Sequence, residues 1–401
     1  MAPESGSSTN GAPVAGPEDV DAGAGEPALQ GVRVLDLGRV LSGPFCAALL
    51  ADLGAEVIKV EPPEGDDSRL FGPFVGDDCA YFRLVNRGKR GITLDLKREP
   101  DRELLAGLAE RSDILIENYR PGTLERLGLG IGELRARNPR LIVISISGFG
   151  HTGPLGGAAA YDLIAQAFSG LMSVTGWEAE RPTRCGVSLG DMIPGLYGAL
   201  AAVAALHERA RTGRGQHVDL AMVDSLISVL ESVSMRALHS DEPIVPCGND
   251  HAQTTPLGTY AAADGPVAIG VSNDRLFERL ATALDRPDWL ADPRFMPYPH
   301  RLPNREALRA EIEGELRRMT VAETVALLTA AGVPAAPVHD VRAALAHPQV
   351  RARGIVVQEE DGFETIASPI RLRGSVKPHR APALGEHNEL IDGWLAEPAR
   401  I

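Results

Sequence analysis

Apolar runs alternate with short helical segments and glycine turns through the first 150 residues, and this alternation constrains the fold more than any other feature. The stretch 32–63 reads VRVLDLGRVLSGPFCAALLADLGAEVIKVEPP, in which apolar runs at 32–37 and 56–61 flank a helical segment at 45–52. The same order returns in RGITLDL, a helix at 101–111, DILIEN, a short helix from Thr123 and RLIVISISG. Strands that alternate with helices form a parallel sheet covered on both faces. The sequence therefore predicts an α/β fold with a Rossmann-like large domain.

The chain of 401 residues is long enough for two domains, each with its own core. Residues 1–28 are rich in Gly, Pro, Ala and Ser and offer little to bury, so we predict a disordered tail there. The large domain is predicted at 29–225. Turn residues, short strand-like runs and amphipathic helices then predict a smaller α+β domain at 241–330. Residues 331–401 are expected to return to the large domain.

Charge and hydropathy narrow the class of partner. The net charge of −14 argues against nucleic acid or an anionic membrane surface, since both need a basic footprint. The apolar run Met192–Leu206 is short for a membrane span and contains Pro194, Gly195 and Gly198. We therefore expect no segment that reaches the length of a membrane-spanning helix.

Several common motifs are missing from the sequence. The four cysteines form no C-x-x-C and the first residues do not resemble a signal peptide, so we expect a reduced, cytoplasmic protein. The ten histidines show no ligand spacing, and we expect no metal site and no permanently bound cofactor. Glu61 follows the first glycine turn at the distance of a dinucleotide-site acid, but the turn reads GRVLSGP rather than G-x-G-x-x-G. A nicotinamide dinucleotide site is therefore disfavoured.

A single carboxylate precedes the longest uncharged segment. In GVSLGDMIPGLYGALAAVAALHER, which starts at Gly186, Asp191 is followed by fifteen uncharged residues. The ordinary interpretation is an N-cap, because Asp accepts hydrogen bonds from the first turn of a helix. Clusters of basic residues in NRGKRGITLDLK and ENYRPGTLERLG border predicted strands and either hold phosphates or are solvated surface charges.

Long motifs in a fixed order resemble the class III CoA-transferases, a family that includes formyl-CoA transferase and carnitine CoA-transferase. They are GVRVLDLGRVLSGPFCAALLADLGAEVIKVEPPEGDDSR, NRGKRGITLDLK, ILIENYRPGTLERLGLG, ISGFGHTGPLGGAAAYDLIAQAFSGLMSVTG and GVSLGDMIPGLYGALAAVAALHERARTGRGQHVDLAM. The resemblance covers about 29–390. It implies a Rossmann-like large domain, a small domain and a homodimer of interlocked chains, with the active site at the domain interface.

The resemblance also implies roles for individual residues. The family's catalytic aspartate matches Asp191, which would be a nucleophile at a helix N-terminus. Tyr161, Asp162 and Gly248 would line the active site, with CGNDHAQTTPLG as a cover. An arginine that binds CoA in formyl-CoA transferase is Pro62 here, and a glutamine near its aspartate is Leu41, which argues against formyl or oxalate specificity. The family's CoA contacts match Val40, Leu41, Ser42, Leu94, Lys97, Asn118, Tyr119, Arg126 and Leu127.

The implied reaction moves CoA from a donor thioester, succinyl-CoA or a similar compound, to a small carboxylic acid through covalent intermediates on Asp191. An α-methylacyl-CoA racemase is the nearest alternative. It needs a histidine and a glutamate where this chain has Tyr161 and Ala261, so two-base proton transfer is disfavoured. A non-catalytic acyl-CoA-binding protein is the other alternative, and the retained Asp191 motif counts against it.

Overall fold

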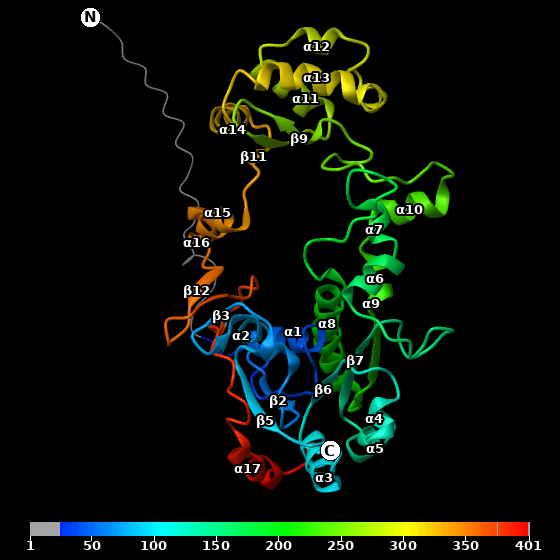
Figure 1. The fold of residues 1–401 in the computed structure, drawn as a ribbon, viewed down its shortest axis with the longest axis vertical. Helices are drawn as coiled ribbons and strands as arrows, with labels where there is room; N and C mark the ends of the chain where they lie inside the picture. The colour runs from blue at the N-terminus through cyan, green and yellow to red at the C-terminus, as the bar shows by residue number, and fades with distance from the viewer. Residues whose placement is uncertain (1–24, 375, 400–401) are drawn as a thin grey trace, which may run out of the picture. The chain divides into compact units, whose positions relative to one another are not determined.

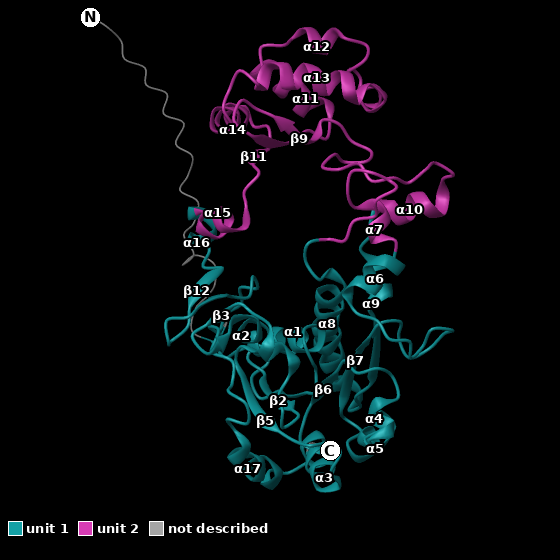
Figure 2. Cartoon of the chain, viewed as in Figure 1, with its two compact units in different colours: residues 1–169, 186–231, 348–401 teal, residues 170–185, 232–347 magenta. Residues whose placement is uncertain are grey.

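The computed structural model describes residues 25–374 and 376–399, so the tail predicted at 1–28 lies almost wholly outside the described residues. The chain divides into two compact units (Figure 2). Unit 1 combines the residues up to 169 with 186–231 and those from 348 onward, and unit 2 combines 170–185 with 232–347. The small domain expected at 241–330 falls within unit 2, whose limits are wider.

Unit 1 is built on a six-stranded parallel sheet (Figure 1), which confirms the predicted α/β class. The strand order is β5-β2-β1-β6-β7-β8, and each neighbouring pair runs in parallel. All residues of the central strands β1, β6 and β7 are buried, as expected for strands covered on both faces. The strands are β1 Arg33–Asp36, β2 Glu56–Glu61, β5 Lys89–Thr93, β6 Ile114–Glu117, β7 Ile142–Ser147 and β8 His217–Ala221.

Helices cover both faces of this sheet. On one face α3, α5 and the C-terminal α17 enclose a core that includes Leu35, Ile58, Leu115 and Trp394. On the other face α1 contacts β1, β2 and β6, while α8 contacts β7 and β8. The helices of unit 1 are α1 Ser42–Asp52, α2 Ala80–Asn86, α3 Glu99–Glu110, α4 Thr123–Arg126, α5 Ile131–Arg137, α6 Asp162–Phe168, α8 Leu189–Thr212, α9 Met222–Ser228, α16 Pro348–Ala352 and α17 Ile391–Ala396. Its smaller elements are η1 Asp67–Leu70, β3 Phe74–Val75, β4 Asp78–Cys79, β12 Val356–Gln358, β13 Glu364–Ile366 and η4 Asn388–Leu390.

Small residues let α8 approach α1 closely. A Cβ atom at Gly198 would lie 2.9 Å from the Sγ atom of Cys46, and one at Gly195 would lie 3.0 Å from the Ser42 carbonyl oxygen. The buried residues of α8 are almost all small: Gly190, Pro194, Gly195, Gly198, Ala199, Ala202 and Ala205, with Arg209 near the end. The side chains at these positions therefore determine how close the two helices lie.

The length of α8 corrects one expectation. The helix has 24 residues, and by length and composition alone it could cross a membrane. The expectation that no segment reaches that length is wrong, because the helix begins three residues before Met192 and ends six residues after Leu206. Core helices of globular proteins have the same length and composition, and here the buried residues of α8 pack on α1 and β7.

Unit 2 has its own antiparallel sheet and core. The sheet order is β11-β10-β9, and Phe277, Trp289, Phe295, Leu308 and Ile312 form the centre of the core. Its strands are β9 Leu257–Ala261, β10 Pro266–Gly270 and β11 Ala335–Pro337. Its helices are α7 Leu171–Val174, α10 Ser232–His239, α11 Asp274–Ala283, α12 Asp288–Ala291, η2 Tyr298–His300, η3 Leu302–Asn304, α13 Arg305–Leu316, α14 Val321–Ala330 and α15 Val341–Ala346.

Candidate active site

The strand order of unit 1 reverses between β1 and β6. From β1 the chain proceeds outward to β2 and β5, and then from β6 outward in the other direction to β7 and β8. In open parallel sheets ligands bind at the carboxyl ends of the strands at such a reversal. The turn after β1 carries the predicted CoA contacts Val40, Leu41 and Ser42, and the loop after β6 carries Asn118 and Tyr119. The topology therefore brings these five residues to one edge of the sheet.

We call residues 38–42 the Val40 turn. Asn118 holds it, because the Asn118 Oδ1 atom accepts from the Arg39 N–H at 2.7 Å and the Nδ2 atom donates to the Arg39 carbonyl at 3.0 Å. Both polar groups of the Asn118 amide thus bind the protein backbone. The predicted contribution of Asn118 to CoA binding is therefore to shape the Val40 turn.

A second group of predicted contacts lines a cavity of about 550 Å³ beside α3 and α5. Lys97, Arg126 and Leu127 share it with Arg102 and Arg137, which the sequence analysis did not single out. Glu103 pairs with Arg137, but among the described residues neither Lys97 nor Arg126 forms an ion pair with a carboxylate. Cations without a carboxylate partner suit a phosphorylated ligand, although Glu99, Glu103 and Glu133 line the same cavity.

Two predicted contacts are largely structural. The Leu94 side chain is buried in the core of unit 1, and its N–H donates to the Glu61 carbonyl at 2.9 Å. Tyr119 packs against the same core, and burial raises the pKa of its phenol to about 12.

Asp191 is the third residue of α8, and Ser188 occupies the N-cap position. The interpretation of Asp191 as the N-cap is therefore wrong. The Asp191 N–H donates to the Ser188 carbonyl at 3.1 Å, which places the carboxylate in the first turn. The partial positive charge at a helix N-terminus stabilises an anion there.

Asp162 anchors the residue next to Asp191. Its Oδ1 atom accepts from the Gly190 N–H at 2.9 Å and from the Gln166 Nε2 atom at 2.8 Å. The side chain is buried, so Asp162 fixes the start of α8 against α6. Tyr161, one residue earlier, is 81% exposed. The predicted pair of lining residues therefore consists of one buried anchor and one exposed ring.

Tyr81 belongs to this region, although the sequence analysis missed it. Burial raises the pKa of the Tyr81 phenol to about 12, and the negative charges of Asp191 and Asp66 add to the effect. Tyr81 is thus within electrostatic range of the Asp191 carboxylate, and its neutral hydroxyl is a hydrogen-bond donor at neutral pH. Its position on α2 is more than 100 residues from Asp191, and no local pattern links the two.

Glu117 is the last residue of β6 and directly precedes the predicted CoA contacts Asn118 and Tyr119. Its Oε2 atom accepts from the Tyr119 N–H at 2.8 Å, and its Oε1 atom lies 3.9 Å from the His151 Nε2 atom. Burial raises the pKa of Glu117 to about 7, against the hydrogen bonds from Ser145 and Tyr119. Protonation of Glu117 near neutral pH would therefore change the hydrogen bond that holds the loop carrying Tyr119.

Gly248, the predicted lining residue from the second domain, lies in unit 2. It has φ +60, and a Cβ atom there would lie 2.4 Å from the ring of Trp177. Together with Asp250, His251 and Gly258 it lines an open cavity of about 700 Å³, so the predicted cover segment borders a hollow of unit 2. Within the described parts of the chain no group of three or more His, Cys, Asp or Glu residues is arranged to hold a metal.

The sequence matches CoA-transferase family III over residues 29–388. An acetyl-CoA:oxalate CoA-transferase from Acetobacter aceti is 40% identical over 373 residues, which cover 92% of this chain and 96% of that protein. A succinyl-CoA:mesaconate CoA-transferase from Haloarcula marismortui is 42% identical over 385 residues, with coverage of 91% and 96%. The crystal structure of a CAIB/BAIF family protein from Brucella suis aligns with a TM-score of 0.83 at 39% identity, over 92% of this chain and 100% of that one.

The fold and these similarities define an enzyme that transfers coenzyme A between acids. The chain belongs to CoA-transferase family III, which confirms the resemblance seen in the sequence. The relatives named for oxalate and for mesaconate are 40% and 42% identical to it, so overall sequence identity does not indicate which acid this chain uses.

Proposed function

We propose that the protein moves CoA from a dicarboxylic acyl-CoA, succinyl-CoA or a similar thioester, to a small carboxylic acid, with Asp191 as the covalent nucleophile. The observation that carries the proposal is the place of Asp191: a carboxylate in the first turn of α8, in a chain that belongs to a CoA-transferase family. Several relatives are named for succinyl-CoA, which supports that donor.

The proposed reaction has four steps that balance without water, oxidant or nucleotide. The Asp191 carboxylate attacks the donor thioester carbonyl, which gives a mixed anhydride and CoA thiolate. The thiolate attacks the Asp191 carbonyl, which gives an aspartyl-CoA thioester and releases the donor acid. The acceptor carboxylate then attacks the Asp191 carbonyl, which gives a new mixed anhydride and releases CoA thiolate. The thiolate finally attacks the acceptor carbonyl, which gives the acceptor acyl-CoA and frees the Asp191 carboxylate.

CoA would lie along the carboxyl edge of the sheet, from the Val40 turn to the cavity that contains Lys97 and Arg126. The strand reversal between β1 and β6 supports this path, and so do the unpaired cations at the cavity. Arg102 lines the same cavity. It is a candidate to replace the CoA-binding arginine of formyl-CoA transferase, whose position is occupied by Pro62 in this chain.

A homodimer of interlocked chains, in the cytoplasm, is part of the proposal. Exposed apolar side chains on α6 and α8 support a second copy of the chain as the partner, because monomers rarely leave so many large apolar groups in water. They are Leu163, Ile164, Phe168, Leu196 and Leu200.

Steady-state kinetics of Asp191→Asn tests the function. The variant should lose about a thousandfold or more in kcat but keep CoA binding and most of its thermal stability, because Asn has nearly the size and shape of Asp in the first turn of α8. Asp224→Asn is the matched control, since Asp224 is the third residue of α9. Activity of Asp191→Asn within tenfold of the wild type, or α-proton exchange without CoA transfer, would contradict the proposal.

A further inference from the structure

The Val40 turn contains a strained backbone. Val40 has φ +62, and among the described residues it is the only β-branched residue with a positive φ. This region is unfavourable for side chains branched at Cβ and costs free energy unless neighbouring groups enforce it. The strain lies directly before α1, whose first N–H groups have no partner within the helix and take their direction from the turn.

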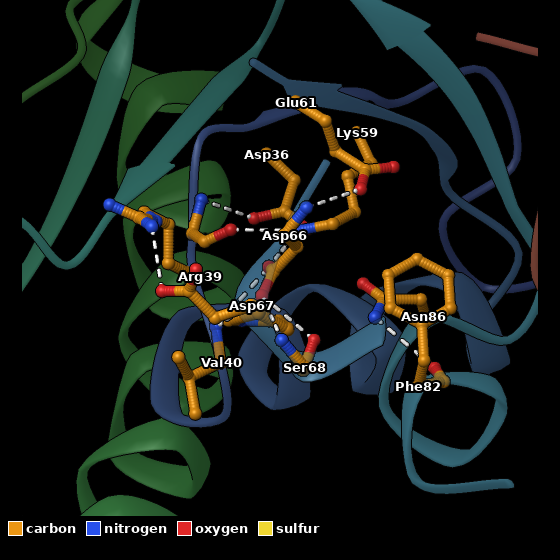
Figure 3. Close-up of polar contacts among 12 residues, drawn as sticks. Asp36, Arg39, Val40, Lys59, Glu61, Asp66, Asp67, Ser68, Phe82 and Asn86 are labelled. Carbon is orange, nitrogen blue, oxygen red and sulfur yellow. Dashed lines mark hydrogen bonds and ion pairs between the residues drawn. The ribbon is translucent and has the colours of Figure 1, made fainter. Parts of the chain in front are cut away.

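Asp66 supplies an enforcing contact (Figure 3). Both of its carboxylate oxygens lie 3.2 Å from the Val40 nitrogen, whose N–H donates to them. The Oδ1 atom also accepts from the Ser68 N–H at 2.9 Å, and the Oδ2 atom accepts from the Lys59 Nζ atom at 3.0 Å. The Asp66 side chain is 1% exposed. With its oxygens buried and bound, it is placed to hold the turn rather than to touch a ligand.

Lys59 holds the other end of the same turn. Lys59 is the fourth residue of β2, and its buried ammonium group donates to the Gly38 carbonyl at 2.7 Å as well as to Asp66. Burial opposes ionisation of Asp66, but the charge of Lys59 and the hydrogen bonds from Ser68 outweigh it and keep the pKa of that carboxyl below its ordinary value. Glu61 in turn accepts from the Asp66 N–H at 2.9 Å, and both of its oxygens accept from the Arg69 guanidinium.

We propose that Asp66 and Lys59 are positioning residues for CoA binding, because together they hold the Val40 turn in the conformation that presents the start of α1. We call this pair the Asp66–Lys59 clamp. The inference rests on the proposed function, which places CoA at this turn. It predicts that loss of the clamp weakens CoA binding without removing the nucleophile.

The test compares CoA binding in wild type and in Asp66→Ala/Lys59→Met, which removes both charges so that neither is left buried and unpaired. Calorimetry should show that the dissociation constant for CoA rises at least about tenfold, while kcat at saturating donor changes less than about threefold. Asp67→Asn is the matched control: Asp67 is exposed and binds only the Arg39 side chain of the turn, so its CoA affinity should stay at the wild-type value.

The same substitutions made in a Val40→Gly variant separate a positioning role from a general loss of structure. Glycine adopts φ +62 without strain, so Val40→Gly should reduce the effect of the clamp substitutions from about tenfold to less than about threefold. Equal losses in both backgrounds, or wild-type affinity in the clamp variant, would overturn the inference. A wild type that does not bind CoA would overturn the proposed function itself, and the inference with it.

Hydrogen exchange of residues 37–42 in the ligand-free enzyme gives a readout that does not need CoA. Exchange should be faster in the clamp variant and unchanged in Asp67→Asn, and equal rates would count against the clamp. If the double variant does not fold, Asp66→Asn takes its place, with at least about threefold weaker CoA binding expected. Unchanged affinity in Asp66→Asn would then overturn the inference.

Discussion

At the scale of single residues, Asp191 depends on groups that sequence patterns do not connect to it. Asp162 accepts a hydrogen bond from the Gly190 N–H, next to Asp191, and Tyr81 lies within electrostatic range of the Asp191 carboxylate. The resemblance to the CoA-transferases, rather than the carboxylate itself, selected Asp191 as the candidate nucleophile. It could not reveal Tyr81, because only the packing of α2 brings that ring near α8, and it did not show that Asp162 is a buried anchor.

Glu117 makes stability depend on pH. Burial raises its pKa from the ordinary 4.5 to about 7, so its contribution to stability is fully present below about pH 4.5 and is lost as pH rises through 7. Glu117→Gln mimics the protonated form. Relative to wild type, the variant should gain on the order of 3 kcal/mol in free energy of unfolding between pH 4.5 and 7.5.

Urea denaturation at several pH values checks this prediction. The exposed Glu306→Gln serves as the control and should follow the wild type across the range. If the free energies of unfolding of Glu117→Gln and wild type also change in parallel with pH, the carboxyl of Glu117 is not held protonated by burial.

At the scale of elements, continuous apolar runs made the inner strands predictable. The runs at 32–37 and 56–61 became β1 and β2, because strands covered on both faces show little alternation. The edge strand β8 was missed, since His217 and Asp219 interrupt its apolar residues. Only the small residues of α8 indicated in the sequence that this helix is tightly packed.

Gly198 tests that packing. Alanine is normally favoured over glycine inside a helix by about 1 kcal/mol. At Gly198, however, the new methyl group would lie 2.9 Å from the Cys46 Sγ atom, so Gly198→Ala should destabilise the protein by about 1–3 kcal/mol. Gly314 in α13 has open space around it, and Gly314→Ala should be neutral or stabilising. Thermal unfolding of both variants decides, and a stabilised Gly198→Ala would show that the helices are not in close contact.

At the scale of the whole molecule, the proposed dimer makes a prediction about mass. Light scattering should give twice the mass of one chain, and Leu200→Glu should favour the monomer, since Leu200 is 64% exposed on α8. Leu70→Glu is the control at an 80% exposed leucine outside α6 and α8. A wild-type monomer would contradict the dimer proposal.

Interlocking makes a separate prediction about subunit exchange. Threaded chains cannot part without unfolding, so tagged and untagged dimers mixed under native conditions should form no mixed dimers. Mixed dimers should appear only after denaturation and refolding. Rapid exchange in native buffer would leave a dimer but exclude threading.

Mass spectrometry of the intact enzyme mixed with succinyl-CoA tests the proposed covalent role of Asp191 most directly. We expect an added mass equal to CoA less one water, which peptide mapping assigns to Asp191 and which Asp191→Asn does not form. A panel of other acyl-CoA thioesters follows if succinyl-CoA is not the donor. Turnover with any of these donors but no adduct on Asp191, or an adduct that persists in Asp191→Asn, would contradict the account.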